Sequence, residues 1–116
     1  MRHHNANRKL GRVAKGRKAL LNSLARSLVI HEKIQTTEVK AKELRPYIER
    51  IITRGKADSL AAKRFLFSEF GQSPTAKKII LKLSPKYKDR TGGYTRIIKT
   101  GSRKSDGTHM AVIEFV

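Results

Sequence analysis

Basic residues greatly outnumber acidic ones, and this limits how compactly the chain can fold by itself. The sequence holds 27 Lys and Arg against nine Asp and Glu, which gives a formal net charge of +18. Charges of one sign repel each other and oppose compaction, so a fold with this excess requires a polyanion to neutralise it. Nucleic acid, an anionic membrane surface and an acidic protein are the candidates.

The length and apolar content fit one small domain preceded by an arm. Hydrophobic residues make up 38% of the 116 residues, enough for a modest core in a single domain. Residues 1–15 show neither helical nor strand periodicity and have almost nothing apolar to bury, so we predict an extended basic arm. No acidic residue precedes Glu32. Residues 16–116 are predicted to form one α+β globular domain.

Apolar residues at helical spacing predict about four helices in this domain. The first starts near Gly16 and carries a stripe of Leu, Ala and Val over roughly four turns, ending past Val29. A shorter helix farther along is expected to be capped by Asp58 or Ser59 and to run to about Phe67.

A long helix between these two contains a proline. It is predicted to begin after a hydroxyl cap at Thr36 or Thr37 and to end near Gly55. Pro46 lies inside it, removes a backbone donor and crowds the preceding turn. We therefore expect a kink or a break near Arg45.

A last helix and three strands complete the predicted fold. The helix begins at Pro74 and is expected to stop at Ser84-Pro85. Segments rich in β-branched or aromatic residues predict strands at 33–36, 94–100 and 110–116, the last two joined by a basic loop. The fold class is thus α+β, with four or so helices packed on a small three-stranded mixed sheet.

Residue types suited to catalysis or metal binding are scarce. The absence of Cys excludes disulfides, thiolate zinc sites and a cysteine nucleophile. His3 and His4 are adjacent on the predicted arm and do not supply the four preorganised ligands of a structural metal site. Gly92-Gly93 belongs to no nucleotide phosphate-loop motif and is interpreted as a tight turn. We expect no enzyme activity, no cofactor, no metal and no small-molecule substrate.

A membrane partner is disfavoured. No stretch approaches the roughly 20 apolar residues of a membrane span. A basic interfacial helix would use bulky aromatic residues opposite its charges, but Trp is absent and aromatic residues are only 6% of the chain. The N-terminus also lacks the apolar core of a secretory signal. Nucleic acid is the favoured polyanion.

The basic residues fall into two clusters and a scattered background. One cluster is the acid-free arm with the start of the first helix. The other surrounds the turn and the final hairpin, where Asp89 and Asp106 are the only acids among Lys86, Lys88, Arg90, Arg96, Lys99, Arg103 and Lys104. Both clusters suit phosphate contacts, because each neutralised phosphate releases counterions. Scattered lysines such as Lys63 and Lys77 are interpreted as a solvated surface.

Composition leaves the kind of nucleic acid open. No zinc finger, basic zipper or RNA-recognition aromatic motif is present. A small body with a basic arm suits a crevice among folded RNA helices. The alternatives are a nucleic-acid-compacting protein of the nucleoid type and, more weakly, a nuclease. A nucleoid protein would usually dimerise, and the sequence has no coiled-coil seam; a nuclease would need clustered carboxylates, whereas the acids here are scattered.

Several runs of residues resemble one known family over the whole chain. They are, in order, Met1-Arg2-His3, Leu10-Gly11-Arg12, Arg17-Lys18-Ala19-Leu20-Leu21, Leu24-Ala25 with Ser27-Leu28, Thr36-Thr37, Ala41-Lys42-Glu43-Leu44-Arg45, Arg90-Thr91-Gly92-Gly93-Tyr94-Thr95-Arg96-Ile97 and Met110-Ala111-Val112-Ile113-Glu114-Phe115-Val116. The sequence resembles the bacterial large-subunit ribosomal protein L17 family. The Gly-Gly-Tyr-Thr-Arg run is the most specific element, and Gly16 departs from a position where the family often has His.

The resemblance implies a structural role in the large ribosomal subunit of the bacterial cytoplasm. It implies binding to 23S rRNA near the outer end of the peptide exit tunnel, beside neighbouring large-subunit ribosomal proteins, with no homo-oligomer expected. Tyr94 is expected to pack on a sugar or base. Together with the charge clusters, the resemblance predicts these rRNA-binding residues: Arg2, His3, His4, Arg8, Lys9, Arg12, Lys15, Arg17, Lys18, Arg90, Tyr94, Arg96, Arg103 and Lys104.

Overall fold

The computed structural model describes residues 14–57 and 59–116. In chain order the elements are α1 (Ala14–His31), β1 (Lys33–Thr37), α2 (Glu38–Gly55), α3 (Leu60–Phe70), α4 (Pro74–Lys78), the π-helical turn η1 (Ile79–Leu83), α5 (Ser84–Lys86), β2 (Thr95–Ser102) and β3 (His109–Phe115). The α+β class is confirmed. The first helix starts at Ala14, two residues before the predicted Gly16. The division into an arm and a single domain stays a prediction, since residues 1–13 lie outside the described part.

The three strands form one antiparallel sheet in the order β1-β3-β2. β3 pairs with β1 from Thr37↔Met110 to Lys33↔Glu114, and with β2 from Ser102↔His109 to Thr95↔Phe115. The prediction of a mixed sheet is wrong. β1 and β2 do run in the same direction, but β3 separates them and is antiparallel to both.

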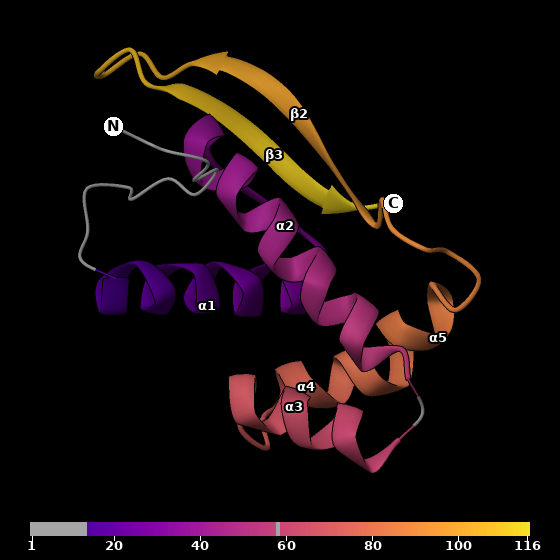
Figure 1. The fold of residues 1–116 in the computed structure, drawn as a ribbon. Helices are drawn as coiled ribbons and strands as arrows, with labels where there is room; N and C mark the ends of the chain where they lie inside the picture. The colour runs from indigo at the N-terminus through magenta and orange to yellow at the C-terminus, as the bar shows by residue number, and fades with distance from the viewer. Residues whose placement is uncertain (1–13, 58) are drawn as a thin grey trace, which may run out of the picture.

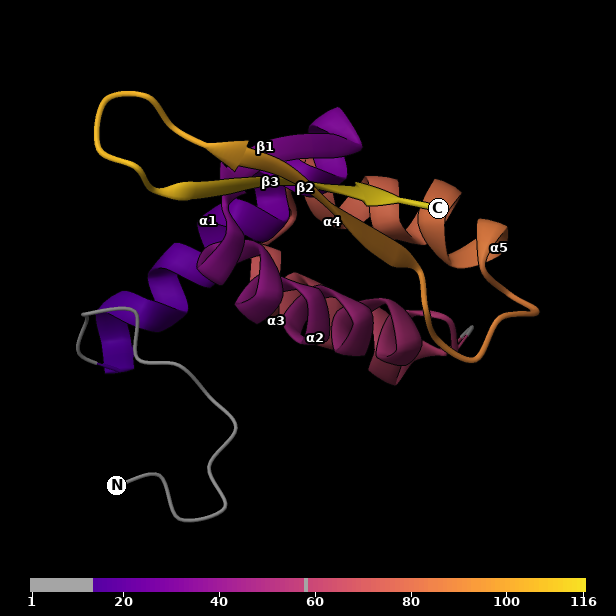
Figure 2. The same cartoon turned by 90° about the horizontal axis from the view of Figure 1, so that it is seen from above.

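Helix α2 lies at the centre of the fold (Figure 1). It contacts the sheet through β2 and β3, and it also contacts α1 and α3. Seen from above, the sheet covers one side of the helical layers and α3 lies away from it (Figure 2). The core between these layers is built from fully buried apolar residues, among them Leu28, Leu44, Ile48, Leu66 and Ile113.

Helix α2 continues through Pro46. Of the kink or break predicted near Arg45, the break is absent. The loss of one backbone hydrogen bond is offset by the burial of the apolar face that the helix presents on both sides of the proline. Leu44, Ile48 and Ile52 each have no exposed surface, and burial of such a side chain contributes about 1.5–3 kcal/mol. The predicted cap is present, because the Thr37 hydroxyl accepts a hydrogen bond from the Lys40 N–H at 3.3 Å.

The last helical stretch does not stop at Ser84-Pro85 as predicted. The Ser84 N–H bonds to the Ile79 carbonyl, five residues back, and α5 then adds one more turn. Pro85 lies in the first turn of α5, where its missing N–H is tolerated. The Tyr87 N–H donates to the Leu83 carbonyl at 3.1 Å and ends the turn.

Candidate nucleic-acid interface

The first turns of α1 present basic side chains at one end of the molecule. Lys15 and Lys18 are exposed and Arg17 is half-buried. Both views show this half of α1 extending away from the sheet (Figures 1 and 2). The first turn contains no acidic residue to complement the positive end of the helix dipole. An anion bound here would therefore interact favourably with the lysines and with the helix terminus.

A groove between α1 and α2 extends this basic end. It is lined by Ala14, Arg17, Lys18, Leu21, Glu43, Pro46, Tyr47 and Arg50. The sequence-based prediction missed Arg50, an exposed residue of α2. It follows Pro46 by four residues and Tyr47 by three, which places all of them on one helix face, and that periodicity could have identified it. The groove brings a third cation beside Arg17 and Lys18.

A second groove runs along the other side of α1. Its lining residues are Lys15, Lys18, Ala19, Asn22, Ser23, Arg26, Ser68 and Glu69. Arg26 is held in place, since it donates to the Asn22 side chain at 2.8 Å and lies over the Phe70 ring. Lys18 borders both grooves. The α1 end thus presents cations toward both flanking grooves.

A hydrogen-bonded tyrosine fixes the base of these two grooves. The Tyr47 hydroxyl donates to the Glu69 carboxylate at 3.2 Å, and the Asn22 amide donates to the Glu69 carbonyl at 2.9 Å. Burial raises the pKa of the Tyr47 hydroxyl above its ordinary value, so the hydroxyl stays protonated and can keep donating. These contacts join α1, α2 and α3 beneath the basic residues.

The glycine turn before β2 buries the residue that follows it. Gly93 has a φ of 66°, a left-handed conformation that favours glycine. Tyr94 then points into the core with no exposed surface, and its ring centroid lies 5.1 Å from that of Tyr87. Its hydroxyl is 3.0 Å from the Thr53 hydroxyl. The expectation that Tyr94 packs on a sugar or base is therefore wrong, because its ring is already enclosed by protein.

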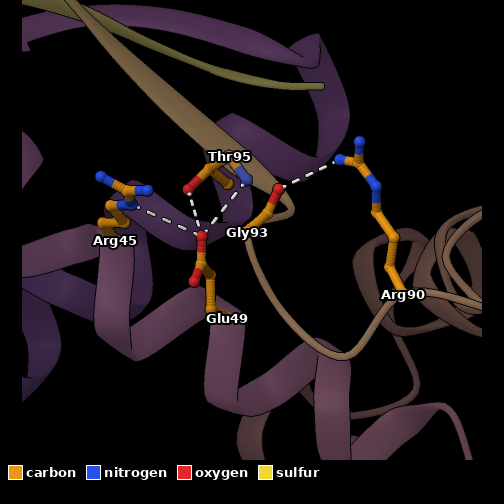
Figure 3. Close-up of polar contacts among 5 residues, drawn as sticks. All are labelled: Arg45, Glu49, Arg90, Gly93 and Thr95. Carbon is orange, nitrogen blue, oxygen red and sulfur yellow. Dashed lines mark hydrogen bonds and ion pairs between the residues drawn. The ribbon is translucent and has the colours of Figure 1, made fainter.

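Glu49 anchors the next residue of the same motif (Figure 3). Its carboxylate accepts from the Thr95 hydroxyl at 2.8 Å and from the Thr95 N–H at 3.3 Å. Arg45, one turn earlier in α2, lies 3.6 Å from the same carboxylate oxygen. The Gly-Gly-Tyr-Thr part of the motif consequently has a structural role, and its flanking arginines are the residues left to face a ligand.

Arg90 faces outward beside the turn. One of its terminal nitrogens donates to the Gly93 carbonyl at 3.1 Å (Figure 3). Its own carbonyl accepts from the Tyr94 hydroxyl and from the Lys56 ammonium. A guanidinium carries five N–H donors, so a single bond to Gly93 leaves donors for a phosphate oxygen.

Two other predicted contacts have acidic partners, one within the sheet and one in the hairpin loop. Arg96 donates to Glu114 on the neighbouring strand at 2.8 Å. In the hairpin loop, Arg103 makes two hydrogen bonds to Asp106, at 3.0 and 2.6 Å. The Arg103 bonds, with a further bond from the Thr108 N–H, hold the pKa of the Asp106 carboxyl well below its usual range. Lys104 lies exposed in the same loop.

The remaining predicted residues are Arg2, His3, His4, Arg8, Lys9 and Arg12, and they lie outside the described residues. Across residues 14–57 and 59–116, no group of three or more His, Cys, Asp or Glu side chains is placed to hold a metal ion. None of the helices in that same part of the chain combines the length and the apolar character needed to cross a membrane.

Comparison with known proteins gives one consistent result. Residues 20–116 match the family model described as ribosomal protein L17. A relative from Wolinella succinogenes, named large ribosomal subunit protein bL17, is 47% identical over all of both chains. Relatives of the same name from Campylobacter jejuni and Bradyrhizobium diazoefficiens are 49% and 50% identical over the whole of this chain, and the matches cover 99% and 84% of those proteins.

Proposed function

This chain belongs to the ribosomal protein L17 family, and from that membership we propose that it binds 23S rRNA in the large ribosomal subunit, near the outer end of the peptide exit tunnel. Members of the family are ribosomal proteins, so the role is structural rather than enzymatic and is exercised in the cytoplasm, within the ribosome. The proposed partners are 23S rRNA and neighbouring large-subunit proteins.

The observation that carries the proposal is the basic end of α1. Lys15, Arg17 and Lys18 lie in its first turns, and Arg50 faces them across a groove. Each of these cations can neutralise a phosphate and release its counterions, which favours any polyanion. Directly before this end in the sequence stand further basic residues without an acid among them. Arm and helix together would form one continuous phosphate-binding strip.

The proposed rRNA contacts follow from exposure and charge. Among the described residues, Lys15, Lys18, Arg90 and Lys104 are exposed, and the contacts given above include no acidic partner for them. The basic residues of the arm are proposed from their charge alone. Arg96 and Arg103 must share their charge with Glu114 and Asp106. We therefore propose weaker contacts for these two. Because contacts to phosphate carry little sequence information, the specificity would come from the shape of the folded rRNA.

Sedimentation of a cell lysate tests the ribosomal assignment. In low magnesium the subunits separate, and the protein should follow the large-subunit particles and leave them only in high salt. If the protein stays off these particles and follows DNA, the nucleoid-type alternative is correct instead.

Chemical footprinting of 23S rRNA tests where the protein binds. Large subunits reconstituted with the wild-type chain should show protected rRNA positions that are open in subunits lacking it. The matched variant replaces Lys15 and Lys18 by Gln; it should lose a subset of those protections. Protections that lie away from the outer end of the tunnel would overturn the proposed location.

A further inference from the structure

A cavity at the other end of α2 lies outside the interface described above. It is enclosed by the end of α2, the start of α3 and the π-helical turn with α5. Its lining residues are Gly55, Lys56, Ala57, Lys63, Ile80, Ser84, Pro85 and Lys88. In both views the helix ends that form it lie at the opposite end of the molecule from the start of α1 (Figures 1 and 2).

The charge around this cavity is positive. Lys56, Lys63 and Lys88 come from three separate segments of the chain, and none of the described lining residues is acidic. Asp58, which lies outside the described residues, and Asp89 follow the lining residues Ala57 and Lys88 in the sequence, and the three lysines outnumber these two acids. Lys63 and Lys88 are exposed. Lys56 is more constrained, since its ammonium donates to the Arg90 carbonyl and lies 5.3 Å from the centre of the Tyr94 ring.

Ser84 lines the cavity with an unused hydroxyl. The residue is 8% exposed, and its Oγ is the buried side-chain polar atom that has no hydrogen-bond partner among the described residues. A buried hydroxyl without a partner is unfavourable, so such a group calls for an explanation such as a ligand. The site also adjoins η1, and π-helical turns occur frequently at functional sites.

Gly55 leaves room beside this hydroxyl. A Cβ at position 55 would lie 3.4 Å from the Ser84 Oγ and 3.2 Å from a Leu66 methyl group. Because glycine has no Cβ, the space next to the Ser84 hydroxyl stays open at the end of α2.

We propose that this cavity binds a phosphate group of the rRNA backbone. Lys63 and Lys88 supply the charge, and the Ser84 hydroxyl donates a hydrogen bond to a phosphate oxygen. Lys56 positions the site by tying it to the turn at Arg90. The identity of the ligand as rRNA rests on the proposed function; the affinity for phosphate does not. With contacts at both ends, the protein would hold two separate segments of RNA.

Binding of inorganic phosphate to the intact protein tests the site directly. In a nitrogen-15 NMR titration, we expect saturable shifts of the Gly55, Ser84 and Lys88 amides that chloride at equal ionic strength does not cause. The double variant Lys63→Gln, Lys88→Gln should lose these shifts. The matched control Lys77→Gln, an exposed lysine of α4, should keep them. Equal shifts in the double variant and the wild type would overturn the proposal.

Ser84→Ala separates a binding role from a structural one. Since the hydroxyl has no internal partner, its removal should leave the urea midpoint unchanged. Phosphate affinity should fall about tenfold to a hundredfold, the effect of losing one hydrogen bond to a charged group. An unchanged phosphate affinity would remove Ser84 from the site.

Binding to 23S rRNA then identifies the ligand. The double variant should lower the slope of log affinity against log salt by about one, as expected for one lost phosphate contact. A slope that stays at the wild-type value, with wild-type protein still bound to rRNA, would contradict the assignment of this cavity to rRNA and leave the proposed function intact. Phosphate shifts in a protein that does not bind 23S rRNA would instead overturn the proposed function and keep the phosphate site.

Discussion

A single carboxylate oxygen of Glu49 accepts hydrogen bonds from both the hydroxyl and the backbone N–H of Thr95, at 2.8 and 3.3 Å. Glu49 lies in the middle of α2 and Thr95 is the first residue of β2. This pair therefore fixes where the strand begins relative to the central helix. It also fixes the direction in which the neighbouring Tyr94 enters the core.

The valine variant of Thr95 should destabilise the fold. Thr95→Val keeps the shape of the side chain but leaves the Glu49 oxygen without its shorter hydrogen bond. The free energy of unfolding in urea should fall by about 1–3 kcal/mol, because a mostly buried charged acceptor loses a donor. Thr100→Val, at an exposed position of the same strand, is the matched control and should change stability by less than about 0.5 kcal/mol. Equal effects of the two variants would contradict the anchoring role.

Tyr94→Phe should affect stability and not RNA binding. The variant removes the hydroxyl that contacts Thr53 and the Arg90 carbonyl, and it keeps the buried ring. We expect the free energy of unfolding to fall by about 0.5–1.5 kcal/mol. The salt slope of 23S rRNA binding should match the wild type at a temperature where both proteins are folded. Weaker RNA binding at unchanged stability would restore Tyr94 as a contact residue.

The sequence predicts the elements well where local chemistry determines them. Ser73 before Pro74 and Thr37 before Glu38 identify helix starts, and both capping hydrogen bonds are present. Pro46 and Pro85 are the exceptions. Both are accommodated for reasons that depend on their surroundings. Pro46 is tolerated because α2 buries apolar residues on both sides of it, and Pro85 because it lies in the first turn of α5, directly after the π-helical turn. Neither packing nor turn type is visible in the local sequence.

The candidate interface is only partly predictable. Charge identifies Lys15, Arg17 and Lys18, but charge alone cannot show that Arg103 already has a partner in Asp106. The expectation that Tyr94 packs on RNA fails for a similar reason. An aromatic residue near two arginines suggests stacking on a base, and only the fold shows that its ring is buried. The cavity at Ser84 depends on residues 55–63 meeting residues 80–88, which no spacing in the sequence indicates.

Deletion of residues 2–13 tests the arm without shortening α1. The deleted segment contains four Lys and Arg residues, Arg2, Arg8, Lys9 and Arg12. If each contacts a phosphate, the salt slope of 23S rRNA binding should fall by about three to four. The urea midpoint serves as the control and should stay close to that of the full chain. An unchanged slope would exclude the arm from the interface.

Asp106→Asn should strengthen RNA binding through the hairpin. In the wild type the Asp106 charge neutralises Arg103, and the variant frees that guanidinium for a phosphate. The salt slope should rise by about one. Lys104→Gln removes a positive charge from the same loop, so this variant should lower the salt slope. If Asp106→Asn leaves the slope unchanged, the hairpin does not contact RNA.

The same pair predicts a pH dependence. Hydrogen bonds from Arg103 lower the pKa of Asp106 in the folded protein. A carboxyl with a depressed folded-state pKa stabilises the fold above its unfolded pKa, and this contribution is lost only as the pH falls through the lower folded value. In an NMR titration, Asp106 should stay ionised below the usual range for aspartate. Arg103→Gln should return its pKa toward that range; no change in Arg103→Gln would exclude the guanidinium as the cause.

The order of the sheet also has a consequence for synthesis. The central strand, β3, is the last of the three to leave the ribosome that makes the chain, yet β1 and β2 pair only with it. β1 must therefore wait without a partner while α2 to α5 and β2 are translated, whereas β2 waits only for the hairpin loop and β3. The helices can form early because their contacts are local, whereas the pairing of β1 with β3 spans most of the chain and is slow by comparison. Co-translational folding should accordingly end in a late step, in which the emerging C-terminal hairpin closes the sheet over α2.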